Sequence, residues 1–131
     1  MSVVVSVAVG GAFGAISRYG LDRVIEQRTE SSFPWSTFVI NVSGCLLVGF
    51  LIAAIVDRRS APEWLRAGLV VGFCGGYTTF STFSYETVAL MEDGQWPRAA
   101  LYVALSLCLS LLAVFLGIAA ARELLALRLK A

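Results

Sequence analysis

Charged residues gather in short segments that separate four long, mainly apolar stretches. The uncharged stretches cover residues 1–17, 31–56, 67–85 and 99–121. A membrane-spanning helix needs roughly 17 to 25 apolar residues, because it rises about 1.5 Å per residue through a hydrocarbon core about 30 Å thick. The pattern therefore predicts four transmembrane helices, at about 2–20, 35–56, 64–90 and 98–121.

Proline and tryptophan mark where these helices begin. Pro34 and Trp35 mark the start of the second predicted helix, Trp64 begins the third, and Trp96 and Pro97 precede the fourth. Proline is tolerated in a first helical turn, and tryptophan favours the membrane interface. We interpret residues 1–131 as one all-α integral membrane domain. Its first stretch is retained as a helix, since it lacks the basic start of a signal peptide.

Composition narrows the class of protein. Hydrophobic residues make up 58% of the chain and charged residues only 15%, which indicates lipid as the surrounding partner. A net charge of +1 without a basic stripe argues against nucleic acid. The three cysteines lie in apolar stretches and there is no histidine, so neither a metal site of cysteine and histidine nor an enzyme is expected.

Four crossings place the N-terminus, the second connection and the C-terminus on one side of the membrane. That side carries six basic residues and the other side carries four. Such a small difference barely selects an orientation under the positive-inside rule. Insertion in both orientations is therefore consistent with the sequence.

Glycines recur at a spacing of four in two stretches. Gly10 and Gly14 lie one helical turn apart, and so do Gly68, Gly72 and Gly76. Small residues let helices approach closely in lipid, where there is no hydrophobic force between them. The spacing predicts tight helix contacts within the chain.

Polar residues also form stripes along the helices. Thr37 and Asn41 are four apart in the second stretch, and Tyr102, Ser106 and Ser110 repeat at four in the last. Polar groups in hydrocarbon are costly and turn toward protein or a cavity. These residues either form hydrogen bonds between helices or line a wet path.

The segment GFCGGYTTFSTFS, residues 72–84, is unusual for a membrane helix. Gly75 and Gly76 weaken a helix, and the hydroxyl residues after them can satisfy freed backbone groups, so a break is expected there. Released carbonyls would suit a small cation, and amides that start the next half-helix would suit an anion. Phe80 and Phe83 then share a face: they either pack in the core or face lipid, or they present positive ring edges to an anion.

Three motifs together resemble the Fluc family of fluoride channels, also called the CrcB family. They are GGAFGAISRY at 10–19, NVSG at 41–44 and the segment 72–84, and the match spans the chain. The resemblance implies an antiparallel, dual-topology homodimer in the inner (plasma) membrane. It implies passive export of fluoride through two pores, which lowers cytoplasmic fluoride, and a structural sodium ion at the dimer centre.

The resemblance also implies roles for individual residues. The implied fluoride pore consists of Asn41, Phe80, Phe83, Ser81, Thr82, Tyr102, Ser106 and Ser110. Arg18 corresponds to the basic residue of the vestibule, and Glu86 to the acid that follows the aromatic pair beside the pore. The sodium ligands map to the backbone carbonyls of Gly75 and Thr78.

Two other functions are compatible with a short four-helix membrane protein. A small multidrug-resistance-type, proton-coupled exporter would need a buried acid in its first helix, and the first stretch has none. A scaffold subunit without transport would explain the glycine stripes but not the polar ones.

Overall fold

The computed structural model describes residues 2–56 and 61–130, with side chains through residue 127, and all its regular elements are helical. The first part holds α1 (Val3–Glu26) and α2 (Trp35–Leu51), which continues into the π-helix η1 (Ile52–Val56). The second holds α3 (Glu63–Ala67), the π-helix η2 (Gly68–Cys74), α4 (Gly75–Tyr77), α5 (Phe80–Glu92) and α6 (Trp96–Lys130). Elements α3, η2 and α4 follow one another directly, so α3 to α5 form one helix with a single interruption.

Three helices of the described residues are long and apolar enough to cross a membrane. They are Val3–Glu26, Trp35–Val56 and Trp96–Leu127. The third predicted span, 64–90, is not among them because it is interrupted before Phe80. Helices α1 and α6 extend beyond their predicted ends near residues 20 and 121, since charged residues continue a helix readily outside the apolar part.

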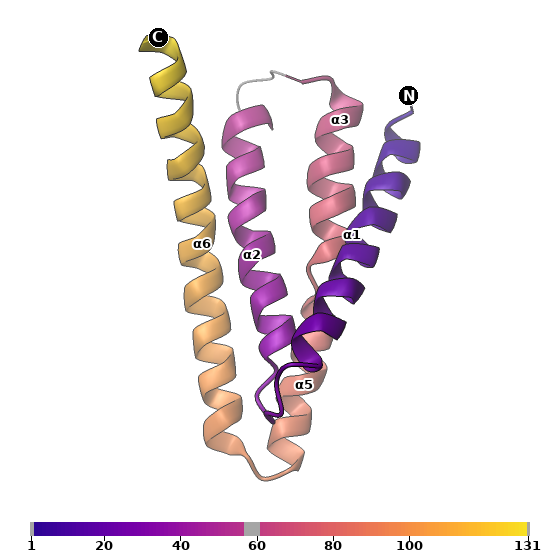
Figure 1. The fold of residues 1–131 in the computed structure, drawn as a ribbon, viewed down its shortest axis with the longest axis vertical. Helices are drawn as coiled ribbons and strands as arrows, with labels where there is room; N and C mark the ends of the chain where they lie inside the picture. The colour runs from indigo at the N-terminus through magenta and orange to yellow at the C-terminus, as the bar shows by residue number, and fades with distance from the viewer. Residues whose placement is uncertain (1, 57–60, 131) are drawn as a thin grey trace.

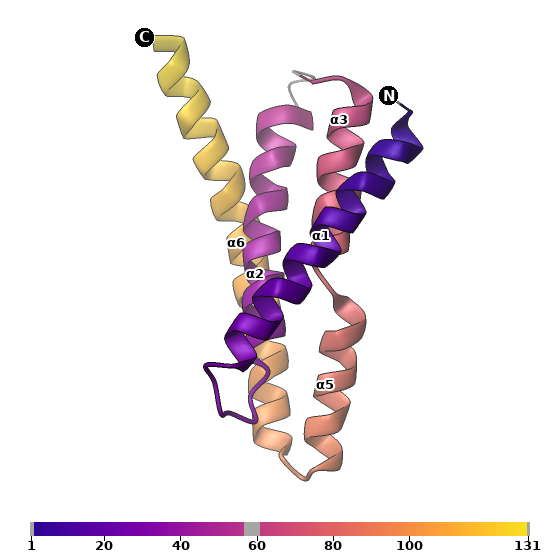
Figure 2. The same cartoon turned by 45° about the vertical axis from the view of Figure 1, so that its right-hand side comes forward.

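The helices run side by side as a narrow bundle. Figures 1 and 2 show the two chain ends at the same end of the molecule, with the turn between α5 and α6 at the opposite end. Helix α2 packs along α6, while α1 crosses the third helix on the other side. A small core at the α5–α6 end consists of Leu90, Ala99 and Tyr102. Large apolar side chains such as Phe13 and Phe115 point outward, as lipid-facing residues do.

The two glycine stripes face each other across the contact between α1 and the third helix. A Cβ on Gly72 would lie 3.1 Å from the Gly10 Cα, and a Cβ on Gly76 would lie 3.1 Å from the Gly11 Cα. A Cβ on Gly14 would collide with the Phe73 carbonyl. Only glycine allows these backbones to approach so closely, and the predicted tight contacts are confirmed.

The third helix does break, but not at the predicted glycines. Gly75 is helical (φ −66°, ψ −34°), whereas Thr78 (φ −81°, ψ 159°) and Thr79 (φ −149°, ψ 115°) are extended. The predicted break within residues 72–84 is therefore confirmed, but Gly75 and Gly76, to which it was attributed, are themselves helical. Gly76 serves the close contact with α1. The groups that replace the lost helical acceptors are the Asn41 side-chain amide, which binds the Thr79 N–H, and the Thr79 hydroxyl, which binds the Thr82 N–H.

Candidate functional site

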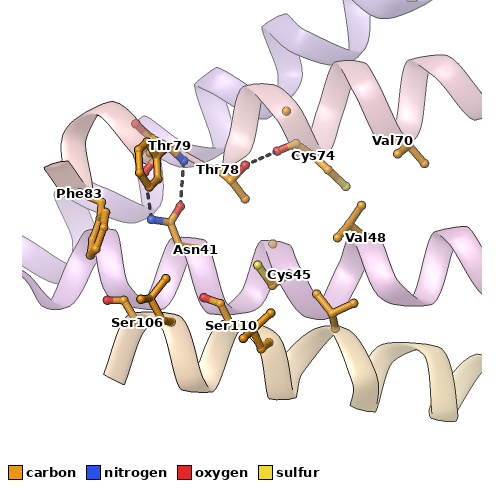
Figure 3. Close-up of a pocket in the computed structure, with 16 residues that line it drawn as sticks. Asn41, Cys45, Val48, Val70, Cys74, Thr78, Thr79, Phe83, Ser106 and Ser110 are labelled. Carbon is orange, nitrogen blue, oxygen red and sulfur yellow. Dashed lines mark hydrogen bonds between the residues drawn. The ribbon is translucent and has the colours of Figure 1, made fainter. Parts of the chain in front are cut away.

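A hollow of about 460 Å³ lies between α2, the interrupted third helix and α6 (Figure 3). None of its described lining residues carries a charge. One part of the lining is apolar, with Val48, Val70 and Leu111. Its polar side chains, apart from two cysteines, are Asn41, Thr78, Thr79, Ser106 and Ser110.

Asn41 on α2 reaches the break through both atoms of its side-chain amide. The Oδ1 atom accepts a hydrogen bond from the Thr79 N–H at 2.8 Å, and Nδ2 donates to the Thr79 carbonyl at 3.0 Å (Figure 3). An Nδ2 group has two hydrogens. One is therefore engaged by Thr79, and the other is available to an acceptor in the hollow.

Ser106 contributes a buried hydroxyl that lacks a partner. Its side chain is 7% exposed, and among the described residues its Oγ has no hydrogen-bond partner. Figure 3 shows Ser106 and Ser110 extending from α6 toward α2. Leaving a buried hydroxyl unpaired costs about 1–3 kcal/mol, and its position on the hollow makes Ser106 a candidate donor to an ion or water there.

Phe80 and Phe83 lie on the same hollow, at the start of α5. Their ring centroids are 5.7 Å apart with an interplanar angle of 43°. Phe80 is 77% exposed, while Phe83 is half-buried and its ring centroid lies 5.1 Å from that of Tyr102. Phe83 is thus supported by core packing, whereas the Phe80 ring lies on the surface of the single chain.

Glu86 and Tyr102 form a polar cluster beside the hollow rather than in its wall. The Tyr102 hydroxyl donates to Glu86 Oε2 at 2.7 Å, and the Thr37 hydroxyl donates to Oε1 at 2.8 Å. Tyr102 is fully buried. Both carboxyl oxygens of Glu86 therefore have a donor, and three helices are joined through this one side chain.

Three other predicted residues, Ser81, Thr82 and Arg18, do not line the hollow. Ser81 and Thr82 are exposed, and their hydroxyls lie 3.3 Å and 2.9 Å from the Thr79 Oγ1. Arg18 lies on α1 and lines neither this hollow nor a second one. The second hollow, of about 220 Å³, lies between the end of α1, the connection to α2 and Glu86.

The backbone at the break fits the implied cation site. In a continuous helix the Thr79 and Thr82 N–H groups would donate to the carbonyls of Gly75 and Thr78. They donate instead to the Asn41 Oδ1 and the Thr79 Oγ1, at 2.8 and 3.2 Å. Both carbonyls thus lack their helical donors, and both residues line the hollow. A small cation would supply the missing partner.

Two residues of this region were missed from the sequence as site residues. Thr79 caps α5 by accepting the Thr82 N–H, and Thr37 holds Glu86. The four-residue spacing of Thr37 and Asn41 placed both on one face of α2. Their separate partners on the third helix could not be read from that spacing.

Fold and site together define a small helical membrane protein with an uncharged hollow lined in part by polar side chains and two phenylalanines. The chain matches the family described as CrcB-like protein, Camphor Resistance (CrcB), over residues 5–118. It belongs to this family.

Similar proteins carry one name. A fluoride-specific ion channel FluC of Geobacter sulfurreducens is 43% identical over 124 residues, covering 95% of this chain and 100% of that protein. Proteins of the same name are 39% identical over 124 residues in Flavobacterium psychrophilum (95% of this chain, 100% of that one) and 45% identical over 117 residues in Paramagnetospirillum magneticum (88% and 91%).

Proposed function

We propose that this protein is a fluoride-selective ion channel that passively exports fluoride and so lowers its cytoplasmic concentration. The observation that carries the proposal is the match, over 95% of the chain, to relatives named fluoride-specific ion channels. The uncharged hollow, with its five polar side chains, supports it independently. As an ion channel the protein carries out no enzymatic reaction.

The chemistry of the hollow suits a small, strongly hydrated anion. Such an ion passes only if donors replace its lost water and yet hold it weakly enough to release it. The Ser106 hydroxyl and the second Asn41 Nδ2 hydrogen can donate to it, with Ser110 one turn further along α6. Because the described lining residues carry no fixed positive charge, the ion is not trapped.

Phe80 and Phe83 add a second kind of donor. An aromatic ring carries partial positive charge at its edge, so two rings can stabilise an anion without a formal charge. Both rings border the hollow, and Phe83 is held in place by Tyr102. Ser81 and Thr82 join the path through their contacts with Thr79, and Glu86 lies next to it. We assign Arg18 to the vestibule from the family motif alone.

The proposal includes an assembly of two antiparallel copies, each with four transmembrane helices, in the plasma membrane. The proposed assembly also includes a sodium ion bound by the Gly75 and Thr78 carbonyls. Two surface features support a partner at the break: Phe80 is 77% exposed, and a Cβ on Gly75 would meet nothing within 4 Å. The nearly balanced basic residues permit both orientations.

A flux measurement tests the function. Purified protein in potassium fluoride or potassium chloride liposomes, with valinomycin setting the membrane potential, should release fluoride far faster than chloride. Protein-free liposomes are the control. Equal release of the two anions, or none, would refute the channel. The same assay separates the exporter alternative, because proton-coupled exchange would require a pH gradient and channel flux would not.

A further inference from the structure

We propose that Asn41 and Thr79 are positioning residues that keep the third helix open and leave the Gly75 and Thr78 carbonyls free to bind a cation. The identity of that cation as sodium rests on the proposed function. The clamp is defined here as the Asn41 amide and the Thr79 hydroxyl.

The first half of the clamp comes from α2. Asn41 Oδ1 accepts a hydrogen bond from the Thr79 N–H at 2.8 Å. In a continuous helix this N–H would donate to the Gly75 carbonyl. Asn41 Nδ2 donates to the Thr79 carbonyl at 3.0 Å, so the amide pairs with both backbone groups of one extended residue. This pairing fixes the residue where the helix stops.

The second half comes from the break itself. The Thr79 Oγ1 accepts the Thr82 N–H at 3.2 Å, which a continuous helix would give to the Thr78 carbonyl. Thr79 is thereby the N-cap of α5, and its side chain is 8% exposed. A capping hydroxyl stabilises the start of a helix and so favours a new helix over continuation of the old one.

The two residues whose carbonyls lose donors to the clamp line the same hollow. Gly75 and Thr78 line the hollow, whereas Gly76 and Tyr77, which lie between them, do not. A carbonyl without a partner at membrane depth is costly unless a cation or water compensates for it. The clamp therefore determines which backbone carbonyl oxygens are left free for a cation. Asn41 thus has a second role in addition to donating a hydrogen bond to the transported anion.

Variants that remove one donor or acceptor test the clamp. Asn41→Leu keeps the shape of the side chain without its amide, and Thr79→Val keeps a branched side chain without the hydroxyl. Thr79→Ser is the conservative rescue because it retains the hydroxyl. Ser43→Ala is the matched control, since Ser43 on α2 contacts Ile40 and Tyr77 but not Thr79.

Two readouts are measured on the full chain in detergent. Amide hydrogen exchange of ¹⁵N-threonine-labelled protein reports on Thr79 and Thr82, and a sodium titration gives the concentration that retains half of the dimer on size exclusion. In Asn41→Leu the Thr79 amide should exchange about tenfold faster or more, and in Thr79→Val the Thr82 amide should do so. Both variants should need about tenfold more sodium, whereas Thr79→Ser and Ser43→Ala should match the wild type.

Each of the other possible outcomes refutes one part of the proposal. Unchanged exchange in both variants refutes the clamp, whatever happens to sodium. Faster exchange with an unchanged sodium midpoint refutes its role toward the cation. A wild-type dimer indifferent to sodium refutes the sodium site, and the clamp is then judged on exchange alone. Fluoride flux of the wild type is measured separately, so failure of the channel function is distinguishable from failure of the clamp.

Discussion

Gly14 is a position at which one methyl group should damage the contact between α1 and the third helix. It lies on α1 against the third helix, where a Cβ would collide with the Phe73 carbonyl and lie 2.8 Å from the Tyr77 nitrogen. These are backbone atoms of a packed helix, so no side chain can move aside. Gly14→Ala should therefore push α1 away from the element that carries the break.

Gly11 provides the matched control on the same helix. A Cβ there would lie 3.8 Å from the Gly72 carbonyl oxygen, an ordinary contact. Replacing glycine by alanine within a helix gains about 1 kcal/mol of helix propensity at either position. The difference between the two variants thus isolates the steric cost, which overpacking data put at about 1–3 kcal/mol.

The measurement is reversible unfolding of both variants in mixed micelles, followed by fluoride efflux from liposomes. Gly14→Ala should be less stable than Gly11→Ala by about 1–3 kcal/mol and should lose flux. Gly11→Ala should be as stable as the wild type or more so, with flux retained. Equal stability of the two variants would show that α1 does not pack as closely as the structure has it.

Four further predictions concern the hollow and its surroundings. Phe80→Ile and Phe83→Ile should each reduce fluoride flux about tenfold or more with the dimer intact. Only Phe83→Ile should also lower stability, because only Phe83 contacts Tyr102. Unchanged flux in both variants would show that the two rings only pack and do not contact the ion. Ser106→Ala should reduce flux without lowering the free energy of unfolding, since the hydroxyl has no partner in the described chain; a loss of about 1 kcal/mol would reveal an internal bond instead. Tyr102→Phe should cost about 1 kcal/mol by removing one donor from Glu86, and unchanged thermal unfolding would contradict that bond. Replacing sodium by a large organic cation during reconstitution should lower both dimer retention and flux, and indifference of both would exclude a structural sodium ion.

Local sequence features predicted the helices and the contact between α1 and the third helix. Lipid solvates an apolar stretch whatever its neighbours are, so the length of an uncharged stretch is enough to indicate a membrane helix. The glycine spacing is equally local, because residues four apart always share a helical face. The motifs at 10–19, 41–44 and 72–84 also indicated the family, which the comparisons confirmed.

The position of the break shows where such reasoning ends. Glycine has the weakest helix propensity of the residue types in the segment, yet Gly75 and Gly76 are helical and the chain extends at Thr78 and Thr79. Propensity favoured the glycines, but the position depended on which backbone groups found other partners. One of those partners, Asn41, is 38 residues away in the sequence.

The partners of the polar stripes were likewise decided in three dimensions. The sequence placed Tyr102 and Ser106 on one face of a helix, but Tyr102 binds Glu86 while Ser106 has no partner among the described residues and faces the hollow. The sequence alone determined which segments are apolar enough for a membrane and which helix faces are polar or small, because these follow from residue type and helical spacing. Only the tertiary structure decided which polar groups satisfy one another and which remain for an ion, because hydrogen bonds depend on distances between helices that no local pattern fixes.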